Sequence, residues 1–247
     1  MPKRIAPDWL TQWEYAHRGL HGAGVPENSL EGARLAIKRG MGIECDIQRS
    51  ADDIPMVFHD WDLERLTGDE RDTDRVSAAE IGQLKLKGSD QSPPSLADLL
   101  KEVAGRVPIL IEIKSKRGYD VERSCEIVSS EVEHYTGEYA VMSFDPRVAR
   151  WFRRNAPKTC AGLVMREDEY GYTQQAWQRR MAFKIARPDF LAYHIAALPN
   201  PWVAKLRRKG LPILTWTVNS SGTRACALEH TDALISEAEG LSSEVSA

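Results

Sequence analysis

The sequence predicts a (β/α)8 barrel, and three observations support this prediction. From residue 107 onward, short apolar segments typical of strands alternate with longer segments typical of helices, which indicates a parallel sheet covered by helices. Nine strand candidates are present, and eight of them make a barrel if the ninth is the returning arm of a hairpin. The length of 247 residues matches the roughly 250 that this α/β fold usually needs. A doubly wound open sheet is the alternative.

The first part of the chain contains a lead-in, a strand and a helix. Trp9 and Trp13 lie in a polar segment that we interpret as a short helix or cap packed against the body. A short strand is expected over residues 15–19, followed by a glycine-rich loop. Ser29 is a typical N-cap residue and predicts a helix over residues 30–39. No linker or shift in composition follows anywhere, so we expect a single domain over residues 1–247.

The next stretch predicts a β-hairpin. Residues 42–48 alternate between apolar and polar side chains, which is the period of a strand. Residues 54–58 form a second short apolar segment. Only residues 49–53 separate the two, too few for the helical crossover that parallel strands require. The two segments are therefore expected to pair as antiparallel strands.

This hairpin places chemically active side chains together. Glu44 and Asp46 are two residues apart on one strand and therefore project from the same face. If the strands pair about Asp52, His59 returns to the vicinity of Glu44 and Asp46. Two carboxylates and an imidazole then converge on one point, which indicates a functional site.

The remaining elements follow the alternating pattern. Residues 61–92 are polar and charged, with a short helical piece near 77–84, where Ser77 and Glu80 have the spacing of a capping box. A helix is expected over 96–104. Strands are expected over residues 107–113, 139–143, 160–165, 189–193, 212–218 and 232–236. The helices expected between them span residues 119–134, 146–155, 174–186, 201–209 and 220–228.

Composition excludes several classes of protein. With 42% hydrophobic and 28% charged residues, the chain can bury a core beneath an ordinary polar surface. The net charge of −3 gives no reason to expect a nucleic acid as partner. The four cysteines lack any Cys-x-x-Cys pair and are typical of free thiols in a reducing compartment. No Gly-x-Ser-x-Gly elbow and no phosphate-binding P-loop occur.

The sequence also gives expectations about location. The N-terminus lacks the apolar core of a signal peptide, and no apolar run approaches the roughly 18 residues of a membrane span. We therefore expect a cytoplasmic protein without a transmembrane segment. The basic helix expected over 174–186 could touch an anionic membrane, but an outer helix of the barrel is the preferred interpretation. The oligomeric state stays open.

Three carboxylates at strand ends indicate a metal site. Glu112 lies on the strand over 107–113, and in a barrel its carboxylate would join those of Glu44 and Asp46. Three anions around one centre require protons or a cation. Oxygen ligands alone suit a hard divalent ion, Mg²⁺ or Ca²⁺. The alternative is a structural network of ion pairs with Arg18 and Lys114.

The same strand ends carry groups suited to phosphate chemistry. Arg18 and Lys114, next to a divalent cation, would form an electropositive pocket for a small phosphorylated molecule. His17 and His59 could then supply a base and an acid in turn, which indicates phosphodiester hydrolysis. Trp216 points toward the same rim and could contact the substrate. The other histidines are assigned no catalytic role: His21, His134, His194 and His230.

Several ordered motifs resemble the glycerophosphodiester phosphodiesterase family. They extend over nearly the whole chain, from about Tyr15 to Ser236. They comprise His17-Arg18-Gly19, Pro26-Glu27-Asn28-Ser29, Glu44-x-Asp46, Val57-Phe58-His59-Asp60, Leu63-x-Arg65-x-Thr67-Gly68, Pro94-Ser95-Leu96, Glu112-Ile113-Lys114 and Trp216-Thr217-Val218-Asn219.

The resemblance implies a (β/α)8 barrel that cleaves glycerophosphodiesters to glycerol 3-phosphate and an alcohol in a metal-dependent reaction. It implies acid and base roles for His17 and His59 and phosphate contacts for Arg18 and Lys114. Metal ligation is implied for the three carboxylates and, through the family, for Glu27. One departure concerns the last strand, where the family usually has Thr-Asp-x-Pro and this chain has residues 236–239 as Ser-Glu-Ala-Glu. None of the expected ligands lies there.

Two other functions remain open. The same site could act on lysophospholipids in the manner of a phospholipase D, and an apolar groove leading from it would favour that activity. A barrel that binds a phosphorylated ligand without catalysis is the alternative of a different class. The set of two histidines and three acids argues against it.

Overall fold

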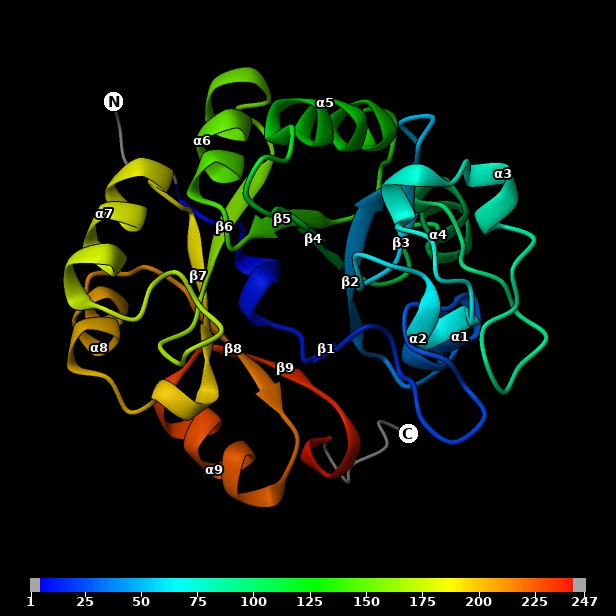
Figure 1. Cartoon of the computed structure of the whole chain (residues 1–247). Coiled ribbons are helices and arrows are strands. Elements are labelled where there is room, and N and C mark those ends of the chain that lie inside the picture. Colours follow the sequence, from blue (N-terminus) through cyan, green and yellow to red (C-terminus); the bar gives the residue numbers. More distant parts are fainter. Residues whose placement is uncertain (1–4, 242–247) are drawn as a thin grey trace.

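The computed structural model describes residues 5–241 and shows a closed barrel of parallel strands (Figure 1). The order around it is β1-β2-β4-β5-β6-β7-β8-β9, and β9 pairs with β1. The strands are Tyr15–Ala16 (β1), Gly42–Arg49 (β2), Ile109–Ile113 (β4), Tyr139–Ser143 (β5), Cys160–Met165 (β6), Phe190–His194 (β7), Ile213–Val218 (β8) and Ala233–Ser236 (β9). The predicted barrel is confirmed. The open-sheet alternative is wrong, because β1 pairs with both β2 and β9.

Helices surround the barrel (Figure 1). They are α1 (Leu30–Lys38), α4 (Leu96–Val103), α5 (Val121–Val132), α6 (Pro146–Asn155), α7 (Ala176–Ala186), α8 (Pro201–Arg208) and α9 (Ser221–His230). Single turns of 3-10 helix are η1 (Asp8–Thr11), η3 (Ile195–Ala197) and η4 (Ala238–Gly240). Within residues 5–241, none of the helices has the length and apolar character needed to cross a membrane.

Capping residues decide where these helices begin. The Ser29 hydroxyl accepts a hydrogen bond from the Gly32 N–H, as its N-cap role predicts. The Asp120 carboxylate caps α5 in the same way, so α5 begins at Val121, two residues after the predicted start. The Gln178 side chain accepts a hydrogen bond from the Gln175 backbone N–H at 2.7 Å, and α7 begins at Ala176.

The predicted hairpin is confirmed. β3 (Pro55–Val57) runs antiparallel to β2, with Ile47 opposite Val57. The Phe58 N–H donates to the Asp46 carbonyl at 3.0 Å. This register centres the turn on Asp52 and brings His59 back along the edge of β2.

Side chains alternate between the inside and the outside of the barrel. On β4, Ile109, Ile111 and Ile113 belong to the core between barrel and helices. Leu110 belongs to a second core inside the barrel, and Glu112 points the same way, one step closer to the carboxyl end of the strand. The strand period therefore places an apolar residue in the barrel interior and a carboxylate at its mouth.

The N-terminal segment closes the opposite end. Leu10, from η1, is fully buried and belongs to the core inside the barrel. The Tyr15 hydroxyl donates to the Leu10 carbonyl at 3.0 Å, and Trp9 and Trp13 pack against the same core. The expectation of a short cap is confirmed.

The segment over residues 61–92 has more structure than predicted. Besides the expected capping box of Ser77 and Glu80 on α3 (Ala78–Ile81), it contains α2 (Glu64–Thr67) and η2 (Thr73–Arg75). Its buried apolar residues Leu63, Val76, Ile81 and Leu86 form a small core with Met56 and Phe58 of the hairpin. This small core gives the segment a fixed structure. The sequence did not indicate it, because most residues of the segment are polar.

Gly162 on β6 is expected to tolerate no side chain. A Cβ atom there would lie 2.3 Å from the ring of Phe190, which fills the barrel interior. Gly162→Ala should lower the free energy of unfolding by about 1–3 kcal/mol, measured by urea denaturation. Gly222→Ala, where a Cβ atom meets nothing within 4 Å, is the control and should leave the free energy of unfolding unchanged or raise it slightly. Equal stabilities of the two variants would contradict this account.

Candidate active site

Three carboxylates meet inside the carboxyl end of the barrel. Glu44 and Asp46 project from β2, and Glu112 projects from β4, where it is in register with Asp46. One oxygen from each carboxylate lies within 4.8 Å of the others. The three residues are 2%, 2% and 7% exposed, respectively. The residues predicted to share one centre therefore do lie together, in a place where water compensates their charges poorly.

Two cations compensate part of this charge. Lys114 Nζ lies 2.7 Å from Asp46 Oδ1 and 2.7 Å from Glu112 Oε1. Arg18 Nε lies 3.3 Å from Asp46 Oδ2. Glu44 receives a hydrogen bond from the Arg18 backbone N–H at 3.0 Å, but no Lys or Arg side chain within residues 5–241 pairs with it.

The pKa values follow this uneven compensation. Burial, together with the charges of Asp46 and Glu112, raises the pKa of Glu44 well above its usual value. Burial acts in the same direction on Asp46, but Lys114 and other neighbouring cations hold its pKa below the usual range. Asp46 and Glu112 in turn raise the pKa of the buried Lys114 ammonium.

The donor set fits a hard divalent cation. All the converging groups are carboxylate oxygens, the ligands that Mg²⁺ and Ca²⁺ prefer. Glu44 is the acid whose ionised form lacks a cationic partner side chain, and its raised pKa records this deficit. A bound cation would supply the missing charge. Ion pairs with Arg18 and Lys114 also exist, so the network alternative describes part of the site but leaves Glu44 unexplained.

Glu44 is expected to destabilise the metal-free protein. Because its pKa is higher in the folded state than the unfolded value of about 4.3, the folded state holds the proton more tightly. The free energy of unfolding then falls as the pH rises from about 4 through the folded-state pKa. Glu44→Gln should therefore raise the free energy of unfolding at neutral pH in chelator, measured by urea denaturation. With saturating Mg²⁺ the order should reverse; the same order in both conditions would contradict the prediction.

His17 is held by a carboxylate from the other end of the chain. Its Nδ1 lies 2.6 Å from Glu237 Oε2, and its Nε2 lies 3.9 Å from Glu44 Oε2. The His17 backbone N–H also donates to the Ser236 carbonyl at 2.9 Å, so β9 fixes both the backbone and the ring. A carboxylate at Nδ1 favours the tautomer with its proton on Nδ1, which leaves Nε2 as the acceptor facing the acids.

His59 is arranged in the same way on the other side. Its Nδ1 lies 2.6 Å from Asp60 Oδ1, and Arg65 Nε donates to the second oxygen of that carboxylate. The Gln48 side chain donates to the His59 carbonyl at 3.1 Å. Although burial raises the pKa of Asp60, the hydrogen bonds from His59 and Arg65 hold it well below the usual value. Asp60 therefore stays ionised and keeps the His59 ring in place.

These groups line one cavity of about 210 Å³. It contains both histidines, the three acids and the two cations that the sequence assigned to a site, and Trp216 lies on its wall. The lining residues are His17, Arg18, Glu44, Asp46, His59, Glu112, Lys114, Met142, Phe144, Arg166, Trp216 and Ile235. The two imidazoles therefore face the same space.

Trp216 forms part of a fixed aromatic wall. Its Nε1 donates to the Ala192 carbonyl at 3.1 Å, and its ring meets Phe144 edge-to-face at 5.3 Å. The Arg166 guanidinium lies 5.5 Å above the ring. The His194 ring packs against the Trp216 ring, with 4.7 Å between their centroids. His194 is not among the residues that line this cavity.

Glu27 lies apart from the three acids. Its Oε1 accepts hydrogen bonds from Arg18 and Arg65 at 2.8 and 2.7 Å, and it is not part of the acidic cluster found among the described residues. Burial raises the pKa of Glu27, but the two guanidinium groups outweigh it and the pKa is lowered. In this structure Glu27 orients Arg18.

Sequence reasoning missed four residues of the site. Asn28 donates to Asp46 Oδ2 at 2.9 Å, and its place in the Pro-Glu-Asn-Ser motif was the available signal. Arg166 directly follows β6, where functional side chains are expected in a barrel, and Asp60 directly follows His59 in the Val-Phe-His-Asp motif. Glu237 lies in the loop where the chain departs from the family pattern, and its carboxylate contacts the His17 ring.

A second cavity of about 410 Å³ opens beside the first and shares five residues with it: His59, Glu112, Lys114, Phe144 and Arg166. Its other walls mix charged and aromatic side chains. They include Asp60, Trp61, Asp62, Lys116, Tyr170 and Tyr172. Lys116 Nζ lies 4.5 Å above the Trp61 ring. Such a surface suits a polar or charged group better than an acyl chain.

Comparison with known proteins gives a consistent result. A sequence profile of the glycerophosphoryl diester phosphodiesterase family matches residues 17–240. A glycerophosphodiester phosphodiesterase of Caldanaerobacter subterraneus is 26% identical over 214 residues, which cover 83% of this chain and 84% of that protein. Glycerophosphodiester phosphodiesterase 1 of Bos taurus is 26% identical over 239 residues, which cover 83% of this chain and 71% of that protein.

Solved structures agree with the fold. A phosphodiesterase of Oleispira antarctica, in complex with the product sn-glycerol-3-phosphate, superposes with a TM-score of 0.78 at 22% identity. The superposition covers 91% of this chain and 92% of that one. A glycerophosphodiester phosphodiesterase of Thermotoga maritima gives a TM-score of 0.73 at 24% identity, covering 90% and 92%.

Proposed function

The chain belongs to the glycerophosphoryl diester phosphodiesterase family, and from this premise we propose that it hydrolyses glycerophosphodiesters to glycerol 3-phosphate and an alcohol. One observation carries the proposal. Two imidazoles, three carboxylates and two cationic side chains line the same cavity at the mouth of the barrel. The product named with the Oleispira enzyme, sn-glycerol-3-phosphate, has the size and charge that this cavity suits.

Glu44, Asp46 and Glu112 would hold Mg²⁺ or Ca²⁺. When bound, such an ion draws electron density from the phosphoryl oxygens and neutralises charge in the transition state. Arg18 and Lys114 also neutralise negative charge on the phosphate. Both side chains are held by ion pairs with the acids and also line the cavity. Because they are already fixed, they can bind and orient the phosphate without losing further conformational freedom.

His17 and His59 move the protons. One imidazole Nε2 takes a proton from the nucleophile, which is either water or the glycerol hydroxyl next to the ester. As the new P–O bond forms and the bond to the alcohol breaks, the other imidazole gives its proton to the departing oxygen. With water as nucleophile this step gives glycerol 3-phosphate directly, whereas with the glycerol hydroxyl it gives a cyclic phosphodiester that water then opens to glycerol 3-phosphate. Glu237 and Asp60 each hold an Nδ1–H, which keeps both Nε2 atoms directed at the phosphate.

The neighbouring cavity favours polar leaving groups over lipids. It shares five residues with the catalytic cavity, and its other walls carry charges of both signs beside tryptophan and tyrosine rings. An acyl chain needs a continuous apolar groove, whereas Asp60, Asp62 and Lys116 place charges in this lining. We therefore prefer glycerophosphodiesters to lysophospholipids as substrates.

A substrate panel tests the proposal. Glycerophosphocholine, glycerophosphoethanolamine, glycerophosphoglycerol and the matching lysophospholipids are incubated with the enzyme, with and without Mg²⁺ or Ca²⁺. Released glycerol 3-phosphate from the water-soluble diesters is the expected result. Faster turnover of the lysophospholipids would favour the phospholipase D alternative. Binding without turnover of any of these, or of bis(p-nitrophenyl) phosphate, would favour the non-catalytic barrel.

A further inference from the structure

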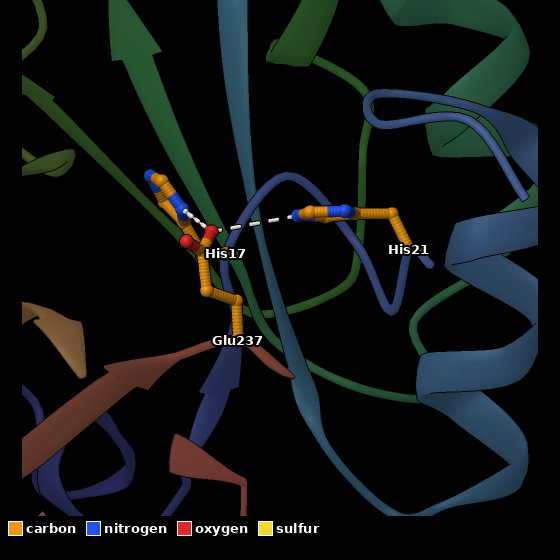
Figure 2. Close-up of side chains that lie close together, drawn as sticks. All are labelled: His17, His21 and Glu237. Atoms are coloured by element: carbon orange, nitrogen blue, oxygen red, sulfur yellow. Dashed lines mark hydrogen bonds and ion pairs between the residues drawn. The ribbon is translucent and has the colours of Figure 1, made fainter. Parts of the chain in front are cut away.

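A second group of metal-ligating atoms lies beside the acidic cluster. Figure 2 shows the Glu237 carboxylate between the rings of His17 and His21, which reach it from opposite sides. Glu237 Oε2 is 2.6 Å from His17 Nδ1 and 3.5 Å from His21 Nε2. One ligand atom from each residue lies within 4.8 Å of the others.

His21 is the unsatisfied member of this group. Its Nε2 is buried, and its ion pair with Glu237 Oε2 at 3.5 Å is longer than the hydrogen bonds that imidazoles and carboxylates usually make. A buried polar atom whose partner is this distant is incompletely satisfied, which costs free energy and calls for an explanation. His21 Nε2 points at Glu237 Oε2 (Figure 2), and a metal ion between them could bind both atoms.

The backbone holds the three residues in position. The Glu237 N–H donates to the Val218 carbonyl at 2.9 Å, and the His21 N–H donates to the Gly19 carbonyl at 3.0 Å. The His17 N–H is bonded to β9, as described above. The converging side chains therefore start from fixed points on three segments, as ligands of a metal site must.

We propose that His17 Nδ1, His21 Nε2 and Glu237 form a site for Zn²⁺, separate from the site for a hard cation. Two imidazoles and one carboxylate are a ligand set of three-ligand zinc sites, in which water completes the tetrahedron. Tetrahedral bonds of about 2.0–2.1 Å place ligand atoms about 3.4 Å apart. The pair of His21 and Glu237 already has this spacing. His17 Nδ1 needs to move away from Glu237 by less than about 1 Å, and its distance from His21 Nε2, which is within 4.8 Å, needs to reach the same value.

Zinc at this site would inhibit the enzyme. An imidazole that coordinates a metal through Nδ1 carries its remaining proton on Nε2. His17 Nε2 could then no longer accept a proton, and the neutral ring would release one too reluctantly to act as an acid. Either catalytic role is blocked. This consequence rests on the proposed function, whereas the binding of the metal does not.

Co²⁺ binding tests the site directly, because four-coordinate Co²⁺ absorbs visible light and accepts the same ligands. Chelator-treated enzyme is titrated with Co²⁺ in saturating Mg²⁺, which occupies the oxygen-only site. The wild type and the control variant His134→Asn, altered at an exposed histidine, should bind one Co²⁺ with the four-coordinate spectrum. His21→Asn should bind at least about 100-fold more weakly, more than the loss of a second-shell partner usually costs.

Three outcomes would overturn the proposal. These are no four-coordinate spectrum in the wild type, the same affinity in His21→Asn, or loss of Co²⁺ binding in His134→Asn. Circular dichroism tests whether each variant is folded. If His21→Asn does not fold, His21→Gln is used in its place. Zinc inhibition is then measured relative to the zinc-free rate of each protein, and His21→Asn should need at least tenfold more Zn²⁺. Cobalt binding by a protein that hydrolyses no diester would refute the proposed function and leave the metal site intact.

Discussion

Replacing His59 with alanine is expected to lower kcat for glycerophosphodiester hydrolysis by about 100-fold or more. The reason is that an acid or base in direct reach of the reacting atoms contributes about 10²–10⁴ to the rate. His59 lines the cavity with the acids and is held at Nδ1 by Asp60. The measurement is glycerol 3-phosphate release at saturating substrate and metal, together with thermal unfolding to show that the variant is folded.

The same loss is expected for His17→Ala, and the two variants should differ in their response to the leaving group. A good leaving group such as p-nitrophenolate needs no proton, so the variant that lacks the acid should recover most of its rate on bis(p-nitrophenyl) phosphate. The variant that lacks the base should not recover. His134→Ala, at an exposed position on the barrel's outside, is the control. Near-normal turnover by folded His17→Ala or His59→Ala would remove the acid and base assignment.

Removing divalent metal is expected to abolish turnover, and adding Mg²⁺ or Ca²⁺ should restore it. Glu112→Gln should weaken the apparent affinity for the restoring ion by more than about 100-fold, because it removes a direct ligand rather than a second-shell partner. Glu27→Gln is the matched control. Its carboxylate binds Arg18 and Arg65 instead of joining the cluster, so the apparent metal affinity should change by less than about tenfold.

Two results would change this account of the carboxylates. Full activity in chelator would make them a network of ion pairs with Arg18 and Lys114. An equal loss of metal affinity in Glu27→Gln and Glu112→Gln would return Glu27 to the ligand set that the family resemblance implies. The rate should be measured over a range of metal concentrations, so that a loss of affinity is separated from a loss of maximal rate.

Local patterns in the sequence were sufficient for much of the fold and site. The period of two on β2 fixed the shared face of Glu44 and Asp46. The short connection before β3 required a hairpin, and its register about Asp52 brought back His59. The alternation of strands and helices predicted a barrel, whose architecture gathers polar strand ends. The inferences about the hairpin depended only on residues close together in the sequence.

What only the tertiary structure decided depended on distant parts of the chain. Closure of the barrel brings Glu237 to His17, 220 residues away in sequence, because β9 pairs with β1. A guanidinium from α2 draws Glu27 away from the acids. No local period records such contacts, since they arise from where whole elements pack. The sequence alone therefore determined that the two histidines, the three acids and the two cations reach the mouth of the barrel, and the closed barrel determined which other residues join them and which of them touch.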